Sequence, residues 1–352
     1  MQQPKRILIC PLDWGLGHAT RCIPVIRYLL EKNAEVIIAA DARPLALLKQ
    51  EFPEQEFIPF SGYDIDYSGN LPMAFKMLLS VPKILKRIRE EKEELENMVE
   101  RHKIDVVISD NRYGCHSSKT KNIFITHQLM IKAPMGENRL HKRVSGYIKN
   151  YDECWVPDLE GEQNLSGDLS HKFPLPPDTF FIGPLSRFSS SETNVQPLHD
   201  VMAIISGPEP QRSIFEKMIT GQIYQRNIKA FIVSGVPEHS GGSEDGLVKT
   251  SAHMGTPEMQ EEIMRSKVIL SRPGYSTAMD LAALGKKAIF VPTPGQTEQE
   301  YLAKYYEEKK IAFYQEQSEF DLRTALKETM KYNGFEPLPT GAYKARIDLL
   351  LK

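Results

Sequence analysis

The chain has 352 residues, of which 41% are hydrophobic and 26% are charged, a composition typical of a soluble globular protein. This length suits two α/β domains of ordinary size better than one. The 44 basic and 46 acidic residues leave a formal net charge of −2, which gives no support for a protein that binds nucleic acid. No apolar stretch approaches the ~20 residues that a membrane-spanning helix needs.

The four cysteines lie far apart in the sequence and form no CxxC pair; they are Cys10, Cys22, Cys115 and Cys154. Cys10 falls in a predicted buried strand and Cys22 in the first helix, where a small apolar thiol serves packing. This pattern predicts a reduced, cytoplasmic protein with no metal site and no bound cofactor. The apolar run after the basic N-terminus is short and ends at a proline, so it predicts a first strand rather than a signal peptide.

The first half of the chain alternates short, mostly β-branched strands with helical segments. The strands are predicted at Arg6–Leu12, Glu35–Ala40, Ile104–Ser109, Asn122–Thr126 and Glu153–Val156. This alternation is typical of a doubly wound parallel sheet. Prolines then cluster over Phe173–Asp178, a further strand begins at Phe180, and the polar stretch Ser186–Pro197 predicts a linker.

A second alternating series begins at Val201. Its later strands are predicted at Lys229–Val233, Val268–Leu270 and Ala288–Val291, and its helices near Glu258–Ser266, Thr277–Leu284, Glu298–Lys309 and Gly341–Leu351. The sequence therefore predicts a first domain over 1–185, a linker over 186–198 and a second domain over 199–335. Residues 336–352 are expected to form a helix that could pack back on the first domain. Two domains of this kind leave a cleft suited to a large, two-part substrate.

A glycine-rich loop, Asp13-Trp14-Gly15-Leu16-Gly17-His18, follows the first strand. Glycine allows a tight turn and close approach of the backbone to a ligand. We expect His18 at the N-terminus of the first helix, whose positive end disfavours an imidazolium, so the side chain would be neutral near pH 7 and available as a general base. Asp13 is a second candidate base. The alternative interpretation is a helix cap beside a structural turn; the loop lacks the third glycine of the dinucleotide fingerprint.

The segment Lys267–Gln299 forms a complete predicted strand–loop–helix–strand–loop unit. Val268–Leu270 is the first strand, Ser271–Thr277 the turn after it, Thr277–Leu284 the helix and Ala288–Val291 the second strand. In open α/β sheets, ligands bind beyond the carboxyl ends of the strands, where helix N-termini offer N–H groups to anions. Both polar loops fall at such ends, so this unit predicts a site for a phosphate-bearing ligand.

Together, the Gly15-Leu16-Gly17-His18 loop and the Ser271–Gln299 unit resemble the two-domain GT-B glycosyltransferases, most closely family 28, which includes the N-acetylglucosaminyltransferase of lipid II synthesis. The resemblance covers the architecture of nearly the whole chain, whereas similarity in sequence is confined to these two segments. It implies an α/β fold of the GT-B type, with two Rossmann-like domains facing a central cleft. It also implies that Gly15, Gly17 and His18 face the acceptor, while the second domain holds a nucleotide-sugar.

The resemblance assigns roles to residues of the second domain. Ser271-Arg272-x-Gly274 matches the loop before the nucleotide-binding helix, and Tyr275, Ser276 and Thr277 fall where hydroxyl and N–H groups meet the diphosphate. Asp280 falls where the family places a carboxylate that accepts hydrogen bonds from both ribose hydroxyls. Its alternative role is a first-turn acid that stabilises the helix dipole. The later polar loop that contacts the sugar donor is matched by Gln296, Glu298 and Gln299.

One loop departs from the family pattern. The second domain begins with Ser206-Gly207-Pro208-Glu209-Pro210, where family 28 has a Gly-Ser-Gln-Gly type of turn. Ser206 and Gly207 keep their positions on the donor side, but two prolines remove two N–H donors and Glu209 adds a negative charge. Either this loop only starts a helix, or the donor is held differently, with Arg212, Arg272 or a helix dipole supplying the compensating charge.

Two further loops at predicted carboxyl ends carry polar side chains in the first domain. Asp110 follows one strand and could orient His18 or bind an acceptor hydroxyl, and His127 follows the next strand and could do likewise. A structural polar cap is an equal alternative for each. The stretch Leu71–Arg89 mixes apolar and basic residues and could touch an anionic membrane surface, but a helix packed on the sheet, interrupted at Pro82, is favoured.

The sequence therefore predicts a glycosyltransferase that moves a hexosyl group, with inversion, from a nucleoside-diphosphate sugar, preferably a UDP-sugar, to an acceptor hydroxyl of a glycan, a lipid-linked molecule or a small molecule. Helix N–H groups rather than a metal would stabilise the departing diphosphate; the only DxD match is Asp64-Ile65-Asp66. The main alternative is hydrolysis, because Gly15-x-Gly17-His18-x-x-Arg21-Cys22 also resembles the nucleotide-sugar hydrolases of pseudaminic acid synthesis. An epimerase and a non-catalytic sugar-nucleotide-binding protein are further alternatives. We expect a cytoplasmic enzyme, at the inner face of the membrane if its acceptor is lipid-linked.

Overall fold

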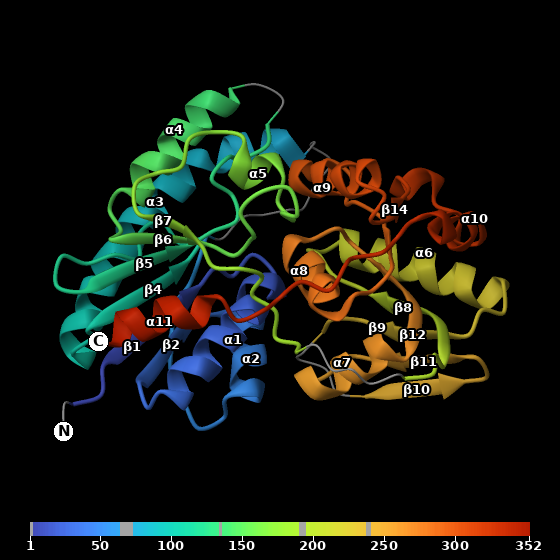
Figure 1. The fold of residues 1–352 in the computed structure, drawn as a ribbon, viewed down its shortest axis with the longest axis horizontal. Coiled ribbons are helices and arrows are strands. Elements are labelled where there is room, and N and C mark those ends of the chain that lie inside the picture. Colours follow the sequence, from blue (N-terminus) through green and yellow to red (C-terminus); the bar gives the residue numbers. More distant parts are fainter. Residues whose placement is uncertain (1–2, 64–72, 134–135, 190–194, 237–240) are drawn as a thin grey trace. The chain divides into compact units, whose positions relative to one another are not determined.

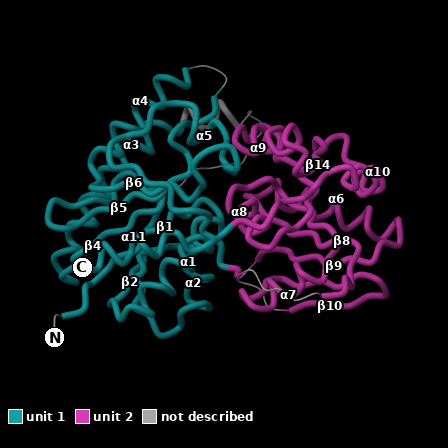
Figure 2. The backbone as a smooth tube through the Cα atoms, in the orientation of Figure 1, with its two compact units in different colours: residues 1–65, 75–187, 339–352 teal, residues 66–74, 188–338 magenta. Residues whose placement is uncertain are grey.

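The computed structural model describes residues 3–63, 73–133, 136–189, 195–236 and 241–352. The chain divides into two compact units, shown as a ribbon in Figure 1 and in separate colours in Figure 2. Met1–Ile65, Phe75–Arg187 and Pro339–Lys352 make up the first unit, and Asp66–Ala74 with Phe188–Leu338 make up the second. The end of the chain therefore returns to the unit in which the chain begins.

The first unit is built on a parallel sheet with the strand order β3-β2-β1-β4-β5-β6-β7. Its strands are nearly continuous apolar runs, and Ile7–Pro11 of the first strand is fully buried, as expected for a parallel sheet covered on both faces. The strands are β1 (Arg6–Pro11), β2 (Glu35–Ala40), β3 (Glu56–Pro59), β4 (Val106–Asp110), β5 (Lys121–Ile125), β6 (Glu153–Val156) and β7 (Thr179–Phe181).

Helices connect these strands and complete the first unit. They are α1 (Leu16–Glu31), α2 (Ala42–Glu51), α3 (Met73–His102), α4 (Glu137–Ile148), the single turn α5 (Asp168–His171) and the C-terminal α11 (Tyr343–Leu351). Helix α11 contacts α1 through the Tyr28 hydroxyl, which donates to Asp348 Oδ1 at 3.0 Å, and Arg346 forms an ion pair with Glu153 on β6. These contacts fix the last helix to the first unit.

The second unit contains a sheet with the order β10-β11-β9-β8-β12-β13-β14, in which β10 and β11 pair antiparallel and the other neighbours pair parallel. Its strands are β8 (His199–Ile204), β9 (Ala230–Val233), β10 (Gly242–Asp245), β11 (Val248–Ser251), β12 (Ser266–Ser271), β13 (Ala288–Phe290) and β14 (Phe313–Tyr314). Its helices are α6 (Gln211–Gln225), α7 (Thr256–Met264), α8 (Tyr275–Leu284), α9 (Thr297–Glu308) and α10 (Leu322–Glu328), with short 3₁₀ turns at Gln317–Glu319 and Thr329–Lys331.

In each sheet the chain reverses the direction in which it adds strands at one place. In the first unit this place lies between β1 and β4, and in the second it lies between β8 and β12. The loops that leave two such neighbouring strands turn to opposite faces and open a crevice at the carboxyl edge. The fold therefore directs attention to the loops after β1 and β4 in one unit and after β8 and β12 in the other.

A buried ion pair joins α3 to the loop after β4. Arg112 Nε donates to Glu91 Oε1 at 2.8 Å, both side chains are fully buried, and Arg112 also donates to the carbonyl of Phe60 at 3.0 Å. Tyr63 donates to the other carboxylate oxygen of Glu91 at 3.0 Å. Burial raises the pKa of Glu91, and the positive charge of Arg112 opposes that rise. The pair thus ties three segments together beside the carboxyl edge of the first sheet.

The predicted fold class is confirmed, because both units are α/β and Rossmann-like. The predicted strands are all present, and their starts agree within two residues. The strand expected over Phe180–Pro184 covers Thr179–Phe181 and so ends three residues early. Four short strands were not predicted, namely β3, β10, β11 and β14, because they have few β-branched residues or lie exposed. The helix expected over Glu258–Ser266 was wrong at its end. Helix α7 ends at Met264, and Ser266 lies in β12, where it pairs with His199 of β8.

The expected interruption at Pro82 was also wrong. Helix α3 extends from Met73 to His102 and includes Pro82. The proline removes one N–H donor, and the remaining hydrogen bonds of this long helix are enough to continue it. In this helix Lys86 and Arg87 are paired with Glu90 and Glu94. Asp64-Ile65-Asp66, together with Leu71 and Pro72, lies outside the described residues. In the part of the chain that the structure describes, no helix is long and apolar enough to cross a membrane.

We predict that replacing Arg112 with Met destabilises the first unit by about 3–5 kcal/mol, because the Glu91 carboxylate would remain buried without its partner. Urea unfolding followed by circular dichroism measures the loss. The matched control is Lys119→Met, which removes an ion pair with Glu100 on the surface and should change stability little. Equal effects of the two substitutions would contradict the structural role of the buried pair.

Candidate functional site

The loop after β1 places His18 in the first turn of α1. Gly15 is the residue before this helix and has φ 86° and ψ 174°, a region of backbone conformation that is essentially restricted to glycine. Its N–H donates to the Asp13 carbonyl at 2.9 Å. Gly17 lies within the first turn, and the His18 side chain is 14% exposed. A glycine is therefore required at position 15 for the chain to enter the helix at this angle.

Asp110, the last residue of β4, lies directly beside His18. The distance between His18 Nδ1 and Asp110 Oδ1 is 2.7 Å. The Asp110 carboxylate is fully buried and also accepts two hydrogen bonds from Arg21, one of them from Nε to Oδ2 at 2.5 Å. The strand neighbours β1 and β4 are held in register here by a hydrogen bond of 3.0 Å from the Leu12 N–H to the Asp110 carbonyl. The loops of the first crevice thus converge on one carboxylate.

The electrostatics of this cluster keep Asp110 ionised. Burial by itself would raise the pKa of Asp110, but the charge of Arg21 and the contact with His18 lower that pKa well below its usual range. The neighbouring Cys22 Sγ lies 3.6 Å from Asp110 Oδ2. Burial, followed by the negative charge of Asp110, raises the pKa of the Cys22 thiol well above its usual value. The thiol therefore stays protonated beside a permanent carboxylate.

His127, the other polar residue expected at this edge, lies on the same cluster. It follows β5 and is buried, and its Nδ1 is 2.8 Å from Arg21 NH1. The Ser170 hydroxyl donates to the His127 carbonyl at 2.6 Å and so connects this loop to α5. The structure therefore brings His18, Asp110 and His127 together around Arg21.

Asp13 occupies a different position from these residues. Its Oδ1 is buried and has no hydrogen-bond partner in the described part of the chain. A Cβ atom added at Gly62 would lie only 1.9 Å from this oxygen, so Gly62 allows the two loops to pack closely. The adjacent Trp14 donates from Nε1 to the carbonyl of Tyr63 at 3.2 Å.

In the second unit, helix α8 begins where the turn after β12 was predicted to bind a diphosphate. Gly274 precedes the helix in an extended conformation and makes no side-chain cap, and the first turn contains no acidic residue. Ser276 and Thr277 lie half-buried in this turn, and Asp280 lies half-buried one turn later. Tyr275 is buried. The helix therefore presents small hydroxyl side chains at its positive end, with a carboxylate one turn away.

Arg272 is buried in the loop between β12 and α8. Its NH1 group donates to the carbonyls of Val291 and Pro292 at 2.9 and 3.0 Å, and its NH2 group donates to Gln317 Oε1 at 2.6 Å. The guanidinium also lies 4.0 Å from the centre of the Phe215 ring. All of these partners are neutral, and burial lowers the pKa of Arg272 to about 9. Arg272 thus connects the loops at the carboxyl edge and carries a positive charge with no carboxylate partner among the described residues.

The polar loop before α9 uses its glutamines to begin the helix. Gln296 Oε1 accepts from the N–H of Gln299 at 2.6 Å, and Gln299 Oε1 accepts from the N–H of Thr293 at 2.8 Å. The first of these bonds caps the N-terminus of α9, and the second ties the preceding loop to the helix. Glu298 lies half-buried in the first turn of α9. The side-chain oxygens of Gln296 and Gln299 are therefore engaged in forming the loop.

The loop after β8 neutralises the charge of Glu209. Arg212 Nε donates to Glu209 Oε1 at 2.6 Å, and Glu209 Oε2 accepts from the backbone N–H of Ser213 at 3.2 Å. Ser206 is exposed, and Gly207 has φ 114° with open space where a side chain would be. The Glu209 carboxylate thus occupies the N-terminus of α6, a position that an anion from outside could otherwise fill.

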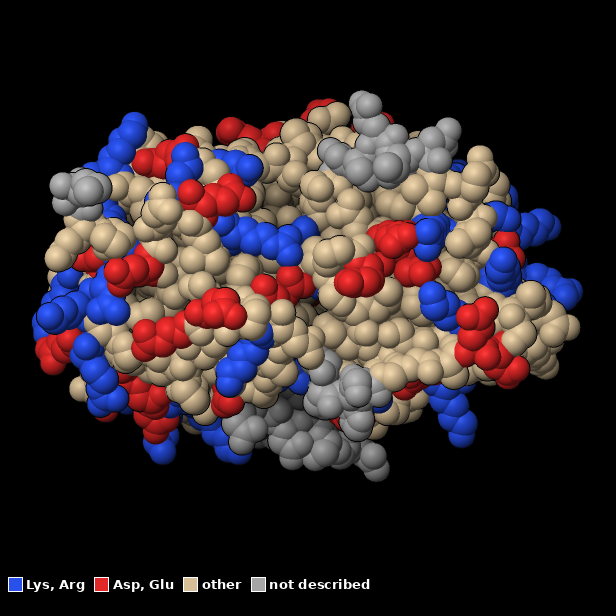
Figure 3. All heavy atoms as spheres, turned by 90° about the horizontal axis from the view of Figure 1, so that it is seen from below, with Lys and Arg blue, Asp and Glu red and all other residues tan. Residues whose placement is uncertain are grey.

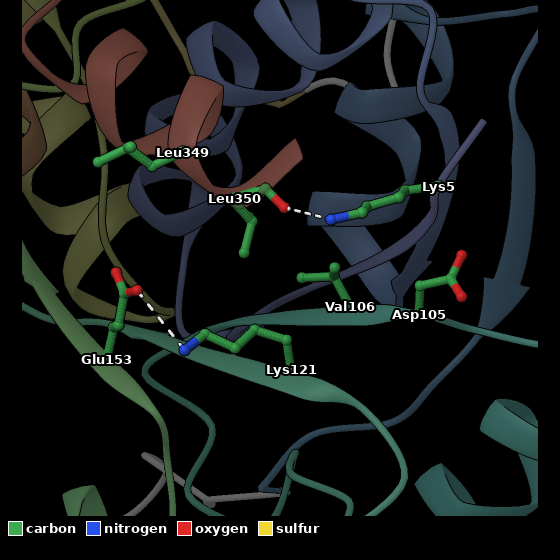
Figure 4. Close-up of a pocket in the computed structure, with 7 residues that line it drawn as sticks. All are labelled: Lys5, Asp105, Val106, Lys121, Glu153, Leu349 and Leu350. Atoms are coloured by element: carbon green, nitrogen blue, oxygen red, sulfur yellow. Dashed lines mark hydrogen bonds and ion pairs between the residues drawn. The ribbon is translucent and has the colours of Figure 1, made fainter. Parts of the chain in front are cut away.

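A cavity of 300 Å³ lies at the opposite edge of the first sheet, beneath α11 (Figure 4). Its charged lining is paired within the protein: Lys5 donates to the Leu350 carbonyl at 2.8 Å, and Lys121 lies 3.6 Å from Glu153. On the face shown in Figure 3, basic and acidic side chains alternate, so the described residues form no broad area of one sign there. We therefore place the candidate functional site at the polar loops beyond the carboxyl edges of the sheets, and not at this cavity or on this face.

The sequence did not assign a role to Arg21, which the structure places at the centre of the first cluster. Its contact with His18, at 3.0 Å between NH2 and Nδ1, follows from their separation of three positions on one helix, which puts both side chains on the same face. That spacing was visible in the sequence. The pairing with Asp110 and His127 was not, because it depends on the order of the strands.

Two family models match the chain. The model of the glycosyltransferase family 28 C-terminal domain matches residues 241–337, and a model of glycosyl transferase family 1 matches residues 5–130. The chain is a glycosyltransferase of the GT-B fold whose C-terminal part is similar to family 28. No curated protein has significant sequence similarity to this glycosyltransferase.

Solved structures of glycosyltransferases share its fold. The kitacinnamycin glycotransferase has a TM-score of 0.64 at 14% identity, over 99% of this chain and 94% of the other. MurG of Acinetobacter baumannii has a TM-score of 0.57 at 13% identity, over 99% of each chain. The glycosyltransferase SsfS6 of Streptomyces sp. SF2575, complexed with thymidine diphosphate, has a TM-score of 0.59 at 14% identity, over 98% of this chain and 99% of the other.

We predict that Gly15→Ala destabilises the glycosyltransferase by about 1–3 kcal/mol, because a non-glycine residue is strained at this φ and ψ. No atom lies within 4 Å of the added Cβ, so the cost is conformational. Gly146→Ala in α4 is the matched control, since it also adds a methyl group in open space but should stabilise the helix by about 0.5–1 kcal/mol. Thermal unfolding measures both, and a neutral Gly15→Ala would refute the requirement.

Proposed function

We propose that this glycosyltransferase transfers a hexosyl group, with inversion, from a nucleoside-diphosphate sugar to an acceptor hydroxyl, with His18 as the general base. The observation that carries the proposal is the 2.7 Å contact between His18 Nδ1 and the buried Asp110 carboxylate. Direct displacement with inversion needs one base that takes the proton of the acceptor hydroxyl as the new bond to the sugar forms. A histidine held by a carboxylate suits that role, because the carboxylate orients the ring and stabilises the imidazolium that forms.

The support on the donor side comes from the second unit. The N-terminus of α8 offers backbone N–H groups and the hydroxyls of Ser276 and Thr277 to a diphosphate. Asp280, one turn further along, would accept hydrogen bonds from the ribose hydroxyls. The uncompensated charge of Arg272 favours an anion in the same region. SsfS6, which shares the fold, was crystallised with thymidine diphosphate. We propose a UDP-sugar as donor, and stabilisation of the departing diphosphate by these groups without a metal.

The loop after β8 has a smaller role in this proposal. Since Glu209 is bound by Arg212 and by the Ser213 N–H, the N-terminus of α6 is occupied by the protein's own carboxylate. Contact with the donor there is left to Ser206 and Gly207. Gln296, Glu298 and Gln299 are proposed to face the sugar. A lipid-linked acceptor, contact with a membrane and a cytoplasmic location stay predictions.

Hydrolysis is the alternative that a specific observation favours. The run Gly15-x-Gly17-His18-x-x-Arg21-Cys22 resembles nucleotide-sugar hydrolases, and in the structure Arg21 and Cys22 both contact Asp110. The same His18 would then activate water instead of an acceptor. Incubation with the matching nucleotide-sugar and no acceptor separates the two functions: rapid, complete release of free sugar indicates hydrolysis, and slow release indicates transfer.

We predict that one of the nucleoside diphosphates UDP, GDP and TDP raises the melting temperature selectively, with UDP giving the largest shift. The monophosphate CMP serves as the reference. Asp280→Asn should weaken binding of that nucleotide roughly tenfold, because an acceptor of ribose hydrogen bonds is lost. Binding of inorganic diphosphate, which has no ribose, is the control and should be unaffected. No response to any nucleotide would refute the donor site.

We also predict that His18→Ala lowers turnover by about 10²–10⁴-fold, because the general base is removed. Nucleotide binding, measured by calorimetry, should be unchanged, since the donor site lies on the other unit. Loss of nucleotide binding would show that the roles of the two units are assigned wrongly. In the turnover assay, excess EDTA tests whether the reaction needs a metal. If it needs none, as proposed, the rate should not change.

A further inference from the structure

Arg21 lies on the buried face of α1 and is in contact with three other polar side chains. It is 1% exposed, and its guanidinium donates two hydrogen bonds to Asp110. The guanidinium also lies 3.0 Å from His18 Nδ1 and 2.8 Å from His127 Nδ1. The three partners come from different elements: His18 from α1, Asp110 from the end of β4 and His127 from the loop after β5. Arg21 is therefore the only one of the four that contacts each of the others directly.

The contact with His127 fixes where the proton of that imidazole lies. A guanidinium stays protonated at any ordinary pH, so it can donate hydrogen bonds and cannot accept them. With Arg21 NH1 2.8 Å away, His127 Nδ1 must therefore carry the lone pair. The hydrogen of the neutral ring then lies on Nε2, because a neutral imidazole has one nitrogen of each kind.

The contact with Asp110 fixes the opposite arrangement in His18. Asp110 is ionised and accepts hydrogen bonds only, so His18 Nδ1 donates its hydrogen to Oδ1 over 2.7 Å. His18 Nε2 then carries the lone pair, as a general base requires. The Arg21 NH2 group lies at 3.0 Å from the same Nδ1 but is satisfied by Asp110 Oδ1, which it shares with His18.

We propose that Arg21 is a positioning residue that holds His18 and His127 in complementary neutral tautomers, with the lone pair on His18 Nε2 and the hydrogen on His127 Nε2. This inference rests on the proposed role of His18 as the base. It assigns to Arg21 the task of holding the Asp110 carboxylate in place, so that this carboxylate orients the His18 ring with its lone pair on Nε2. His127 becomes a neutral hydrogen-bond donor of the same cluster.

The tautomers of the wild-type protein provide the first test. Long-range ¹H–¹⁵N spectra of the full chain, labelled on its nine histidines, distinguish the Nδ1–H from the Nε2–H form. Single His18→Gln and His127→Gln variants identify the two sets of signals. We expect the Nδ1–H form for His18 and the Nε2–H form for His127 at pH 7.5. The opposite tautomer in either ring, or a charged His18, would overturn the proposal.

The variant Arg21→Met provides the second test. Without the guanidinium, His18 and His127 lose a shared partner. His127 should lose its preference for the Nε2–H form, and kcat should fall by roughly tenfold with little change in KM, because the base is oriented less firmly. Arg21→Lys keeps the charge but has no planar group that can reach Asp110 and His127 together, so it should restore much of kcat without restoring the His127 tautomer.

Arg27→Met is the matched control on the same helix. Arg27 pairs with Glu51 at 2.8 Å and contacts neither histidine, so its removal should change neither the tautomers nor kcat. An unchanged kcat together with unchanged tautomers in Arg21→Met would refute the positioning role. If His18→Ala keeps full activity while the wild-type tautomers are as expected, the proposed base is wrong and the tautomer assignment stands.

Discussion

The ion pair between Arg21 and Asp110 is the interaction on which the first crevice depends. It joins the first helix to the end of β4 across the point where the sheet reverses its strand order, and it is fully buried. A buried carboxylate is stable only when it is paired and hydrogen-bonded. Since Asp110 is satisfied by Arg21 and His18 together, the two loops cannot move apart without leaving a charge unpaired. Their geometry is therefore fixed before any substrate binds.

The second crevice also contains a buried arginine, but its surroundings are different. Arg272 donates to backbone carbonyls and to one glutamine, and no carboxylate balances its charge in the described part of the unit. In the first unit the arginine is paired with a carboxylate, whereas in the second its hydrogen-bond partners are neutral. This difference is the basis for proposing an acceptor site in the first unit and a diphosphate site in the second.

Local patterns in the sequence were sufficient for the larger part of the fold. Burial explains the apolar runs of β1, β2 and β6, and backbone conformation explains the glycine at position 15. Both are properties of short segments. The exposed pair β10 and β11 has no apolar pattern and was not predicted. The capping role of Gln296 at the start of α9, and the contact between Gln299 and the N–H of Thr293, were also not foreseen, because both depend on the conformation of the loop.

The two Rossmann-like domains, and the polar loops at the carboxyl ends of their strands, could be predicted from the sequence, because strand periodicity and glycine-rich turns are local signals. Which of those polar residues meet depends on the tertiary structure. His18, Asp110 and His127 come from segments separated by many residues, and the order of strands β1, β4 and β5 brings them onto Arg21. Likewise, only the structure shows that Glu209 pairs with Arg212 and occupies the N-terminus of α6. Charge balance depends on distances in space, which spacing along the chain does not fix.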